Sequence, residues 1–196
     1  WLEPCGEEVK HLVGLTSPMS PWAWFGIWGI IAIAPIIHAW FRRTPISLAI
    51  GASLMMTYLF QATVEWTVEI NLYFQGALIP AVVFQPEHIH RLISAAWLHA
   101  DLFHLLGNVL VIILVGVPLE QRLGRGRFLA IYLIGVLGGN IGWSLANWDS
   151  WVFCIGASGA AFGLLGCYLA CWPRDEIEFP LILIRRWPVA WIALLK

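Results

Sequence analysis

Two short polar motifs interrupt apolar stretches of this sequence. The tetrapeptide GASG at 156–159 opens one apolar stretch, and His99, His104 and Asn108 stand at the start of another, about fifty residues upstream. A serine hydroxyl attacks a carbonyl carbon when a base takes its proton and hydrogen-bond donors stabilise the oxyanion. The glycines beside Ser158 expose its oxygen and free backbone N–H groups, and a helix N-terminus favours negative charge. These residue types predict acyl-transfer chemistry at the ends of two helices.

Each of these residues also has a structural interpretation. Ser158 is a suitable helix N-cap, and a single histidine in a membrane helix can serve as a structural hydrogen-bond partner. Because His104 and Asn108 are four residues apart, they share a helix face, which favours a common site with Ser158 at the same depth. Helical geometry places His99 about half a turn away from that face. His99 is therefore expected to brace the loop above and to lie outside the site.

The elements that must position these residues are membrane helices. The chain has 196 residues, of which 60% are hydrophobic and 12% charged, whereas soluble domains carry about 25% charged residues. A net charge of −1 gives no reason to expect a nucleic-acid partner. A helix needs about 20 mainly apolar residues to cross a bilayer. Stretches that meet or approach this length are 21–41, 46–66, 97–119, 128–148 and 152–172, and a sixth begins near Trp187.

Arginines predict the orientation of these stretches. Eight of them fall in alternate loops, and they are Arg42, Arg43, Arg122, Arg125, Arg127, Arg174, Arg185 and Arg186. The remaining loops contain only Arg91. The positive-inside rule places the arginine-rich loops in the cytoplasm, so His104, Asn108 and Ser158 are expected to face the non-cytoplasmic side.

Two further patterns bear on the surroundings of Ser158. The segment 71–85 is a long outer loop, and its apolar part 77–84 is too short to span a bilayer, so we expect it to be interfacial or re-entrant. Gly135 and Gly139 repeat at helical spacing in one stretch, as Gly159 and Gly163 do in the next. Small residues at this spacing let helix backbones approach closely.

The polar motifs together resemble the rhomboid family of intramembrane serine proteases. His99, His104 and Asn108 followed by GASG form the main likeness, and the EQRLG run at 120–124 resembles another family motif. Arg91 occupies the place of the arginine in the family's Trp-Arg pair, with His90 at the tryptophan position. The likeness covers about 46–196. It implies an all-α, polytopic membrane helical bundle, in which 1–45 adds an extra N-terminal transmembrane helix and 46–196 is a partial core.

The resemblance also implies roles for individual residues. Ser158 would be the nucleophile, flanked by Gly156 and Gly159, and His104 and Asn108 would stabilise the oxyanion. The supporting residues would be His99 and Arg91, which organise the loop above the site, and Glu120 and Arg122, which are structural. The family generally needs no metal or other cofactor. Partners would be the lipid bilayer and transmembrane protein substrates, and the protein would be a multi-pass protein of the plasma membrane.

The general base of the family is a histidine on core helix six, and no histidine follows Ser158 in this sequence. Because the chain starts at Trp1 and ends at Lys196 inside an apolar stretch, we expect a fragment in which core helix five is cut and helix six is absent. The missing histidine would then lie beyond Lys196.

Two functions follow from this reasoning. The first is an intramembrane serine endopeptidase that uses a Ser-His dyad in the full-length protein. The second is a non-catalytic, rhomboid-like pseudoprotease that binds membrane-protein clients. A transporter or metal carrier is disfavoured, because the histidine pairs lack the i, i+4 spacing of helical zinc ligands and no inverted repeat is evident.

Overall fold

The fold is built from long apolar helices. The computed structural model describes residues 19–177 together with 187 and 188. Within them, four helices are long and apolar enough to cross a membrane. These are α2 (Pro21–Arg42), α3 (Ile46–Val68), α6 (Leu102–Leu123) and α7 (Arg125–Ala146). A shorter apolar helix, α8 (Ser158–Cys171), follows them. The prediction of an all-α, multi-pass membrane bundle is confirmed.

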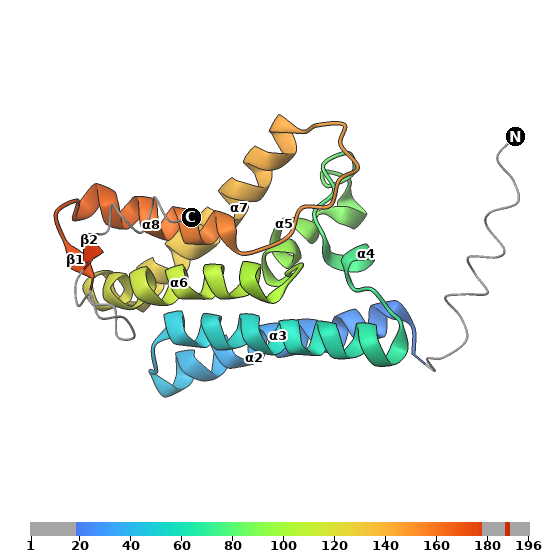
Figure 1. The fold of residues 1–196 in the computed structure, drawn as a ribbon, viewed down its shortest axis with the longest axis horizontal. Helices are drawn as coiled ribbons and strands as arrows, with labels where there is room; N and C mark the ends of the chain where they lie inside the picture. Colours follow the sequence, from blue (N-terminus) through green and yellow to red (C-terminus); the bar gives the residue numbers. More distant parts are fainter. Residues whose placement is uncertain (1–18, 178–186, 189–196) are drawn as a thin grey trace, which may run out of the picture.

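The helices pack in an order that places α6 between α3 and the pair formed by α7 and α8. Helix α3 packs against both α2 and α6, and α8 packs against both α6 and α7 (Figure 1). One apolar core runs through these contacts and includes the fully buried side chains of Leu54, Leu105, Ile112 and Leu164. The two helices that begin with the polar motifs, α6 and α8, therefore lie in direct contact.

The close approach predicted from the glycine repeats is confirmed at the α7–α8 contact. A Cβ added to Gly139 would lie 2.8 Å from the Cα of Gly159, and one added to Gly163 would lie 2.9 Å from the Cα of Gly135. Backbone atoms cannot move aside as a flexible side chain can. Any larger residue at these positions would separate the two helices.

The segment between α3 and α6 is a folded loop. It contains α4 (Tyr73–Gly76), η1 (Pro86–His88), α5 (Arg91–Ser94) and η2 (Ala95–Trp97). Leu78 and Cys154 exchange backbone hydrogen bonds of 3.0 and 2.9 Å, which join this loop to the segment leading into α8. As its length predicted, the apolar stretch 77–84 does not form a helix across the bundle.

Beyond α8, the described residues contain a two-residue antiparallel ladder. Its strands are β1 (Glu176–Ile177) and β2 (Trp187–Pro188), with Glu176 opposite Pro188. The sixth apolar stretch expected from Trp187 onward falls mostly outside the described residues, as do Arg185, Arg186 and nearly all of the N-terminal segment before α2.

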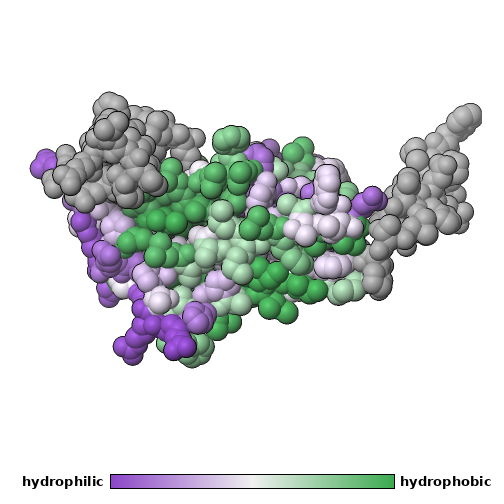
Figure 2. All heavy atoms as spheres, turned by 60° about the horizontal axis from the view of Figure 1, so that its bottom comes forward, coloured by the Kyte–Doolittle hydropathy of each residue, from purple (hydrophilic) through white to green (hydrophobic). Residues whose placement is uncertain are grey.

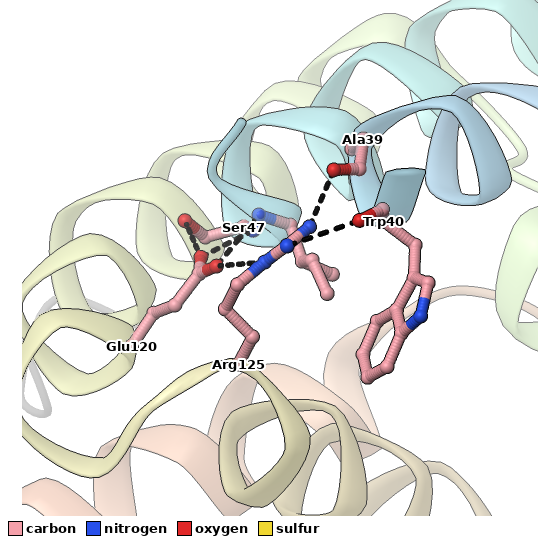
Figure 3. A network of polar contacts seen from close by, with 6 residues as sticks. Ala39, Trp40, Ser47, Glu120 and Arg125 are labelled. Carbon is pink, nitrogen blue, oxygen red and sulfur yellow. Dashed lines mark hydrogen bonds and ion pairs between the residues drawn. The ribbon is translucent and has the colours of Figure 1, made fainter. Parts of the chain in front are cut away.

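A polar network ties the α2–α3 hairpin to the α6–α7 turn (Figure 3). The Glu120 carboxylate accepts hydrogen bonds of 2.8 Å from the backbone N–H groups of Ile46 and Ser47 and from the Ser47 hydroxyl. Arg125 donates to the carbonyls of Ala39 and Trp40 at the end of α2. Helix ends leave such groups unpaired, so a carboxylate at an N-terminus and a guanidinium at a C-terminus satisfy both hydrogen bonding and the helix dipoles.

The surface agrees with membrane embedding. Figure 2 shows hydrophobic residues across the middle of one face and hydrophilic residues gathered at the end where the α2–α3 turn lies. Exposed large apolar side chains on α2 and α3 include Ile30, Ile33, Ile37 and Leu59. Exposed side chains of this kind are expected where lipid is the solvent.

Candidate active site

The first residues of α6 fix the positions of His104 and Asn108. Asp101 adopts an extended backbone and its carboxylate accepts a 2.8 Å hydrogen bond from the His104 N–H, so the helix begins at Leu102. His104 therefore lies in the first turn and Asn108 one turn further in. The His104 side chain is half-buried, whereas Asn108 is buried.

Gly156 brings the segment before α8 against these two side chains. Its φ of +113° lies in a region that favours glycine. A Cβ at this position would lie 2.6 Å from both Cε1 and Nε2 of His104 and 3.5 Å from Nδ2 of Asn108. Its own N–H donates a 2.8 Å hydrogen bond to the Ala95 carbonyl. His104 and Asn108 thus face the same point of the chain, as the i, i+4 spacing predicted.

Ser158 is the first residue of α8. Ala157 occupies the N-cap position, and no side-chain hydrogen bond caps this helix. The interpretation of Ser158 as an N-cap is therefore wrong. Ser158 is half-buried, and it stands in the helical turn whose backbone N–H groups lack helical partners. Ser158 follows Gly156, the glycine that lies against His104, by two residues.

His99 lies inside the site, so the prediction that it lies outside was wrong. Its Nε2 is 3.1 Å from the Asn108 Nδ2 and accepts from the Ala157 N–H at 3.5 Å. The His99 and His104 rings are 5.2 Å apart between centroids. The error has a simple physical cause. Helix α6 begins only at Leu102, so His99 precedes the helix and helical periodicity does not describe its direction.

Two residues that sequence reasoning missed hold the backbone of His99. The amide Nε2 of Gln61, which is buried in α3, donates to the His99 carbonyl at 3.0 Å, and its Oε1 accepts from the His99 N–H at 3.5 Å. The Tyr73 hydroxyl donates to the same carbonyl at 2.7 Å. Burial raises the pKa of Tyr73, so its hydroxyl stays a neutral donor. A polar amide in an apolar helix is costly, and that was the available signal for Gln61.

The loop above the site is organised by Arg91. This buried guanidinium donates to the carbonyls of Phe74 and Ala77, each at 2.7 Å, and to His88 Nδ1 at 3.3 Å. Burial lowers the pKa of Arg91, although an arginine remains charged at neutral pH. These hydrogen bonds hold the backbone of the loop, and the role that the resemblance implies for Arg91 stays a prediction.

His90 ties the same loop to α2. Its Nε2 lies 2.8 Å from the Gln75 carbonyl oxygen. Its ring packs edge-on against Trp22 and Phe25, with centroid separations of 6.0 and 5.9 Å. His90 therefore contacts α2 through its ring and the backbone of the loop through its hydrogen bond.

The remaining predicted residues lie away from the site. Gly159 faces α7, where a Cβ would lie 2.9 Å from the Gly135 carbonyl oxygen. Arg122, at the opposite end of α6, forms an ion pair with Asp175 at 2.5 Å, and its guanidinium lies 4.7 Å from the Trp172 ring centroid. Glu120 is part of the network in Figure 3. These contacts join helices to one another, and the role predicted for Gly159 beside Ser158 stays a prediction.

The side chains at this site could serve as donors to a developing negative charge. His104 and Asn108 both carry N–H groups and meet at Gly156, beside the N-terminus of α8. Among the residues that the structure describes, no three His, Cys, Asp or Glu side chains gather as metal ligands. The histidine expected as general base would lie beyond Lys196 and stays a prediction.

Comparison with known proteins gives consistent likenesses. A family model described as the Rhomboid domain matches residues 86–195, more than half of the chain. RHOMBOID-like protein 1 from Arabidopsis thaliana is 41% identical over 101 residues, which cover 52% of this chain and 25% of the relative. The putative rhomboid protease YdcA from Bacillus subtilis (strain 168) is 46% identical over 79 residues, 40% of this chain and 39% of the relative.

A third relative, Rhomboid-like protease 3 from Toxoplasma gondii, is 33% identical over 98 residues, 50% of this chain and 36% of the relative. The matched region thus spans well under half the length of each of these relatives. No solved structure matches the chain.

Proposed function

This chain belongs to the rhomboid family, and from that premise we propose that the full-length protein is an intramembrane serine endopeptidase. Its substrates would be membrane proteins cleaved in or near their transmembrane segments. The observation that carries this proposal is the contact of Gly156 with both His104 and Asn108, two residues before Ser158. Two of the similar proteins, from B. subtilis and T. gondii, have names that describe them as proteases.

The proposed reaction is acyl transfer through Ser158. The Ser158 oxygen attacks the scissile carbonyl carbon while the histidine expected beyond Lys196 takes its proton. That histidine then protonates the leaving amine as the C–N bond breaks, which leaves an ester on Ser158. Water hydrolyses the ester by the same steps and releases the carboxylate product.

The oxyanion would be stabilised by donors from two helices. The His104 imidazole, the Asn108 amide and the Ser158 backbone N–H would supply them. An amide nitrogen carries two hydrogens. One of those on Asn108 points to His99 Nε2, 3.1 Å away, and the amide would donate the other to the oxyanion when substrate is bound. His99 would then act as a positioning residue that fixes the orientation of the Asn108 amide.

The site would open to the non-cytoplasmic side of the plasma membrane. Arginines such as Arg42, Arg43 and Arg127 lie at the C-terminal end of α2 and the N-terminal end of α7, next to the end of α6 opposite to His104. The positive-inside rule assigns that arginine-rich end to the cytoplasm. Water needed for hydrolysis would reach Ser158 from the other side.

The alternative function is a pseudoprotease that binds membrane-protein clients on the same scaffold. The observation in its favour is that no histidine follows Ser158 in this sequence. Against it stands the complete set of Ser158, His104 and Asn108, held around Gly156 by a backbone conformation that only glycine adopts readily. A protein that only binds clients has no need of that combination.

The test uses the full-length gene with its native continuation past Lys196. Co-expression with a tagged single-span membrane protein should yield a cleavage product, and Ser158→Ala should abolish it. Ser144→Ala is the matched control, because that hydroxyl donates to the Asn140 carbonyl of its own helix, and it should leave cleavage unchanged. Cleavage that persists in the Ser158→Ala variant would reject this mechanism, and client capture without cleavage by the wild type would favour the pseudoprotease.

A further inference from the structure

The α2–α3 hairpin contains a groove that the proposed reaction does not use. It has a volume of about 580 Å³ and is lined by apolar side chains of both helices. Alanines at 34, 39 and 49, together with Pro35, leave space where larger side chains would otherwise meet. From Ile30 to Ala39 the groove follows α2 for about 14 Å. That length matches one leaflet of a hydrocarbon core about 30 Å thick.

The groove becomes polar at the α2–α3 turn. His38 and Thr44 line this end, and Arg42 and Arg43 are exposed in the turn itself. A second cavity of about 200 Å³ shares Thr44 and Pro45 with the groove, and its lining includes Arg43 and Arg125.

The charge at this end is not balanced within the described part of the chain. No ion pair joins Arg42 or Arg43 to a carboxylate there. Glu120, which also lines the second cavity, already accepts three hydrogen bonds from the start of α3.

Arg43 also has an unusual backbone conformation. It is the C-cap of α2 with φ 57° and ψ 27°, the left-handed region. Helices usually place glycine at such positions, since a side chain there is strained. The Arg43 side chain lines the second cavity, which meets the groove at Thr44 and Pro45.

We propose that this groove binds one phospholipid with an anionic headgroup, taken from the leaflet at the arginine-rich end. An acyl chain lies between α2 and α3, and the phosphate is held by Arg43 and the Thr44 hydroxyl. Basic pockets between transmembrane helices recognise anionic headgroups in this way. A second copy of this chain is a poor occupant, because it would insert in the same orientation and bring its own arginines to the same end.

Native mass spectrometry of the detergent-purified chain tests the proposal. The chain is incubated with equal amounts of phosphatidylglycerol and phosphatidylcholine that have the same acyl chains. One phosphatidylglycerol should remain bound in clear excess over phosphatidylcholine. Arg43→Asn should weaken its binding about fivefold, the value of one charge near a membrane surface, and asparagine tolerates the left-handed conformation.

Matched variants distinguish binding in this groove from general electrostatic attraction between an anionic lipid and the basic surface of the protein. Arg127→Asn removes a charge at the same end from a residue that lines neither the groove nor the second cavity, and it should leave phosphatidylglycerol binding unchanged. Ala34→Phe should fill the groove and abolish retention of phosphatidylglycerol. If this variant does not unfold cooperatively, Ala49→Leu fills the groove from α3 and repeats the test. Equal retention of the two lipids, equal effects of the two arginine variants, or retention in both filled variants would overturn the proposal.

Discussion

The Cα of Gly156 faces the His104 imidazole so closely that a Cβ there would lie 2.6 Å from its Nε2. Gly156→Ala should therefore displace either the imidazole or the segment that leads to Ser158. A misplacement of about 1 Å can cost a hundredfold in rate, so we expect a loss of cleavage of at least about that size. The measurement is substrate cleavage by the full-length protein.

The control for this substitution is Gly107→Ala. Gly107 lies in the same helix as His104, and a Cβ there would meet no atom within 4 Å. Alanine should be neutral or mildly stabilising at that position and should leave cleavage intact. Wild-type activity in Gly156→Ala would show that the contact with His104 has no part in the reaction.

Gln61 should act on the site through the His99 backbone. Gln61→Leu removes the Gln61 Oε1 that accepts from the His99 N–H and the Gln61 amide that donates to the His99 carbonyl, to which the Tyr73 hydroxyl still donates. A buried unsatisfied group costs about 1–3 kcal/mol, so the unfolding temperature should fall and cleavage should slow about tenfold or more through kcat, with KM little changed.

Tyr73→Phe separates this positioning effect from general destabilisation. It removes one donor to the same carbonyl, together with the 2.9 Å hydrogen bond from Gln61 Nε2 to the Tyr73 hydroxyl, and retains the Gln61 contacts to the His99 backbone. It should therefore cost about 1 kcal/mol and slow cleavage less than Gln61→Leu. A Gln61→Leu enzyme that loses stability but keeps its kcat would restrict Gln61 to a folding role.

Asp175 should make stability depend on pH at the end of α8. The Arg122 guanidinium and then the Tyr168 hydroxyl hold the pKa of the Asp175 carboxyl below its ordinary value, which is about 3.9. The contribution is therefore fully present above about pH 3.9 and is lost as pH falls through the lowered pKa of the folded state. Asp175→Asn should lower the unfolding temperature at pH 7, and the difference from wild type should disappear at the acid end.

The comparison is a series of thermal unfolding curves between pH 7 and pH 3 for both proteins. Arg122→Gln should show the same convergence, because it removes the other half of the ion pair. A difference between Asp175→Asn and wild type that stays constant over this range would mean that the carboxyl charge does not contribute.

The α7–α8 contact should not tolerate a methyl group at Gly139. A Cβ there would meet the backbone of Gly159 at 2.8 Å, whereas at the neighbouring Gly138 it would meet nothing within 4 Å. Gly139→Ala should lower the free energy of unfolding by about 1–3 kcal/mol, as in overpacked cores. Gly138→Ala should be neutral or slightly stabilising. Equal unfolding free energies of the two variants would contradict the close packing.

Local patterns predicted the helices and much of the site. Apolar length identified the membrane spans, the i, i+4 spacing put His104 and Asn108 on one face, and glycine spacing located the α7–α8 contact. Boundaries were less accurate, because Asp101 starts α6 at Leu102 and not at Trp97 as its hydrophobicity suggested. The placement of His99 failed for the same reason.

What the sequence could not show are contacts between residues far apart along the chain. Gln61 lies 38 residues before His99, and nothing in the spacing of the two connects them. Glu120 was assigned a structural role through resemblance, but the atoms it contacts, at the start of α3, become visible only in three dimensions. Polar residues inside apolar helices mark where such contacts must exist without naming the partners.

The Glu120 contacts have a consequence for biogenesis. Helix α3 begins after Pro45 with no side-chain cap of its own, and the carboxylate that accepts from its Ile46 N–H is synthesised 74 residues later. While α2 and α3 leave the ribosome, these amides must stay in contact with water or with the insertion machinery. The α2–α3 hairpin can reach its final depth in the membrane only after the α6–α7 turn has been synthesised. Membrane insertion of this chain therefore includes a step in which a later segment fixes the position of an earlier one.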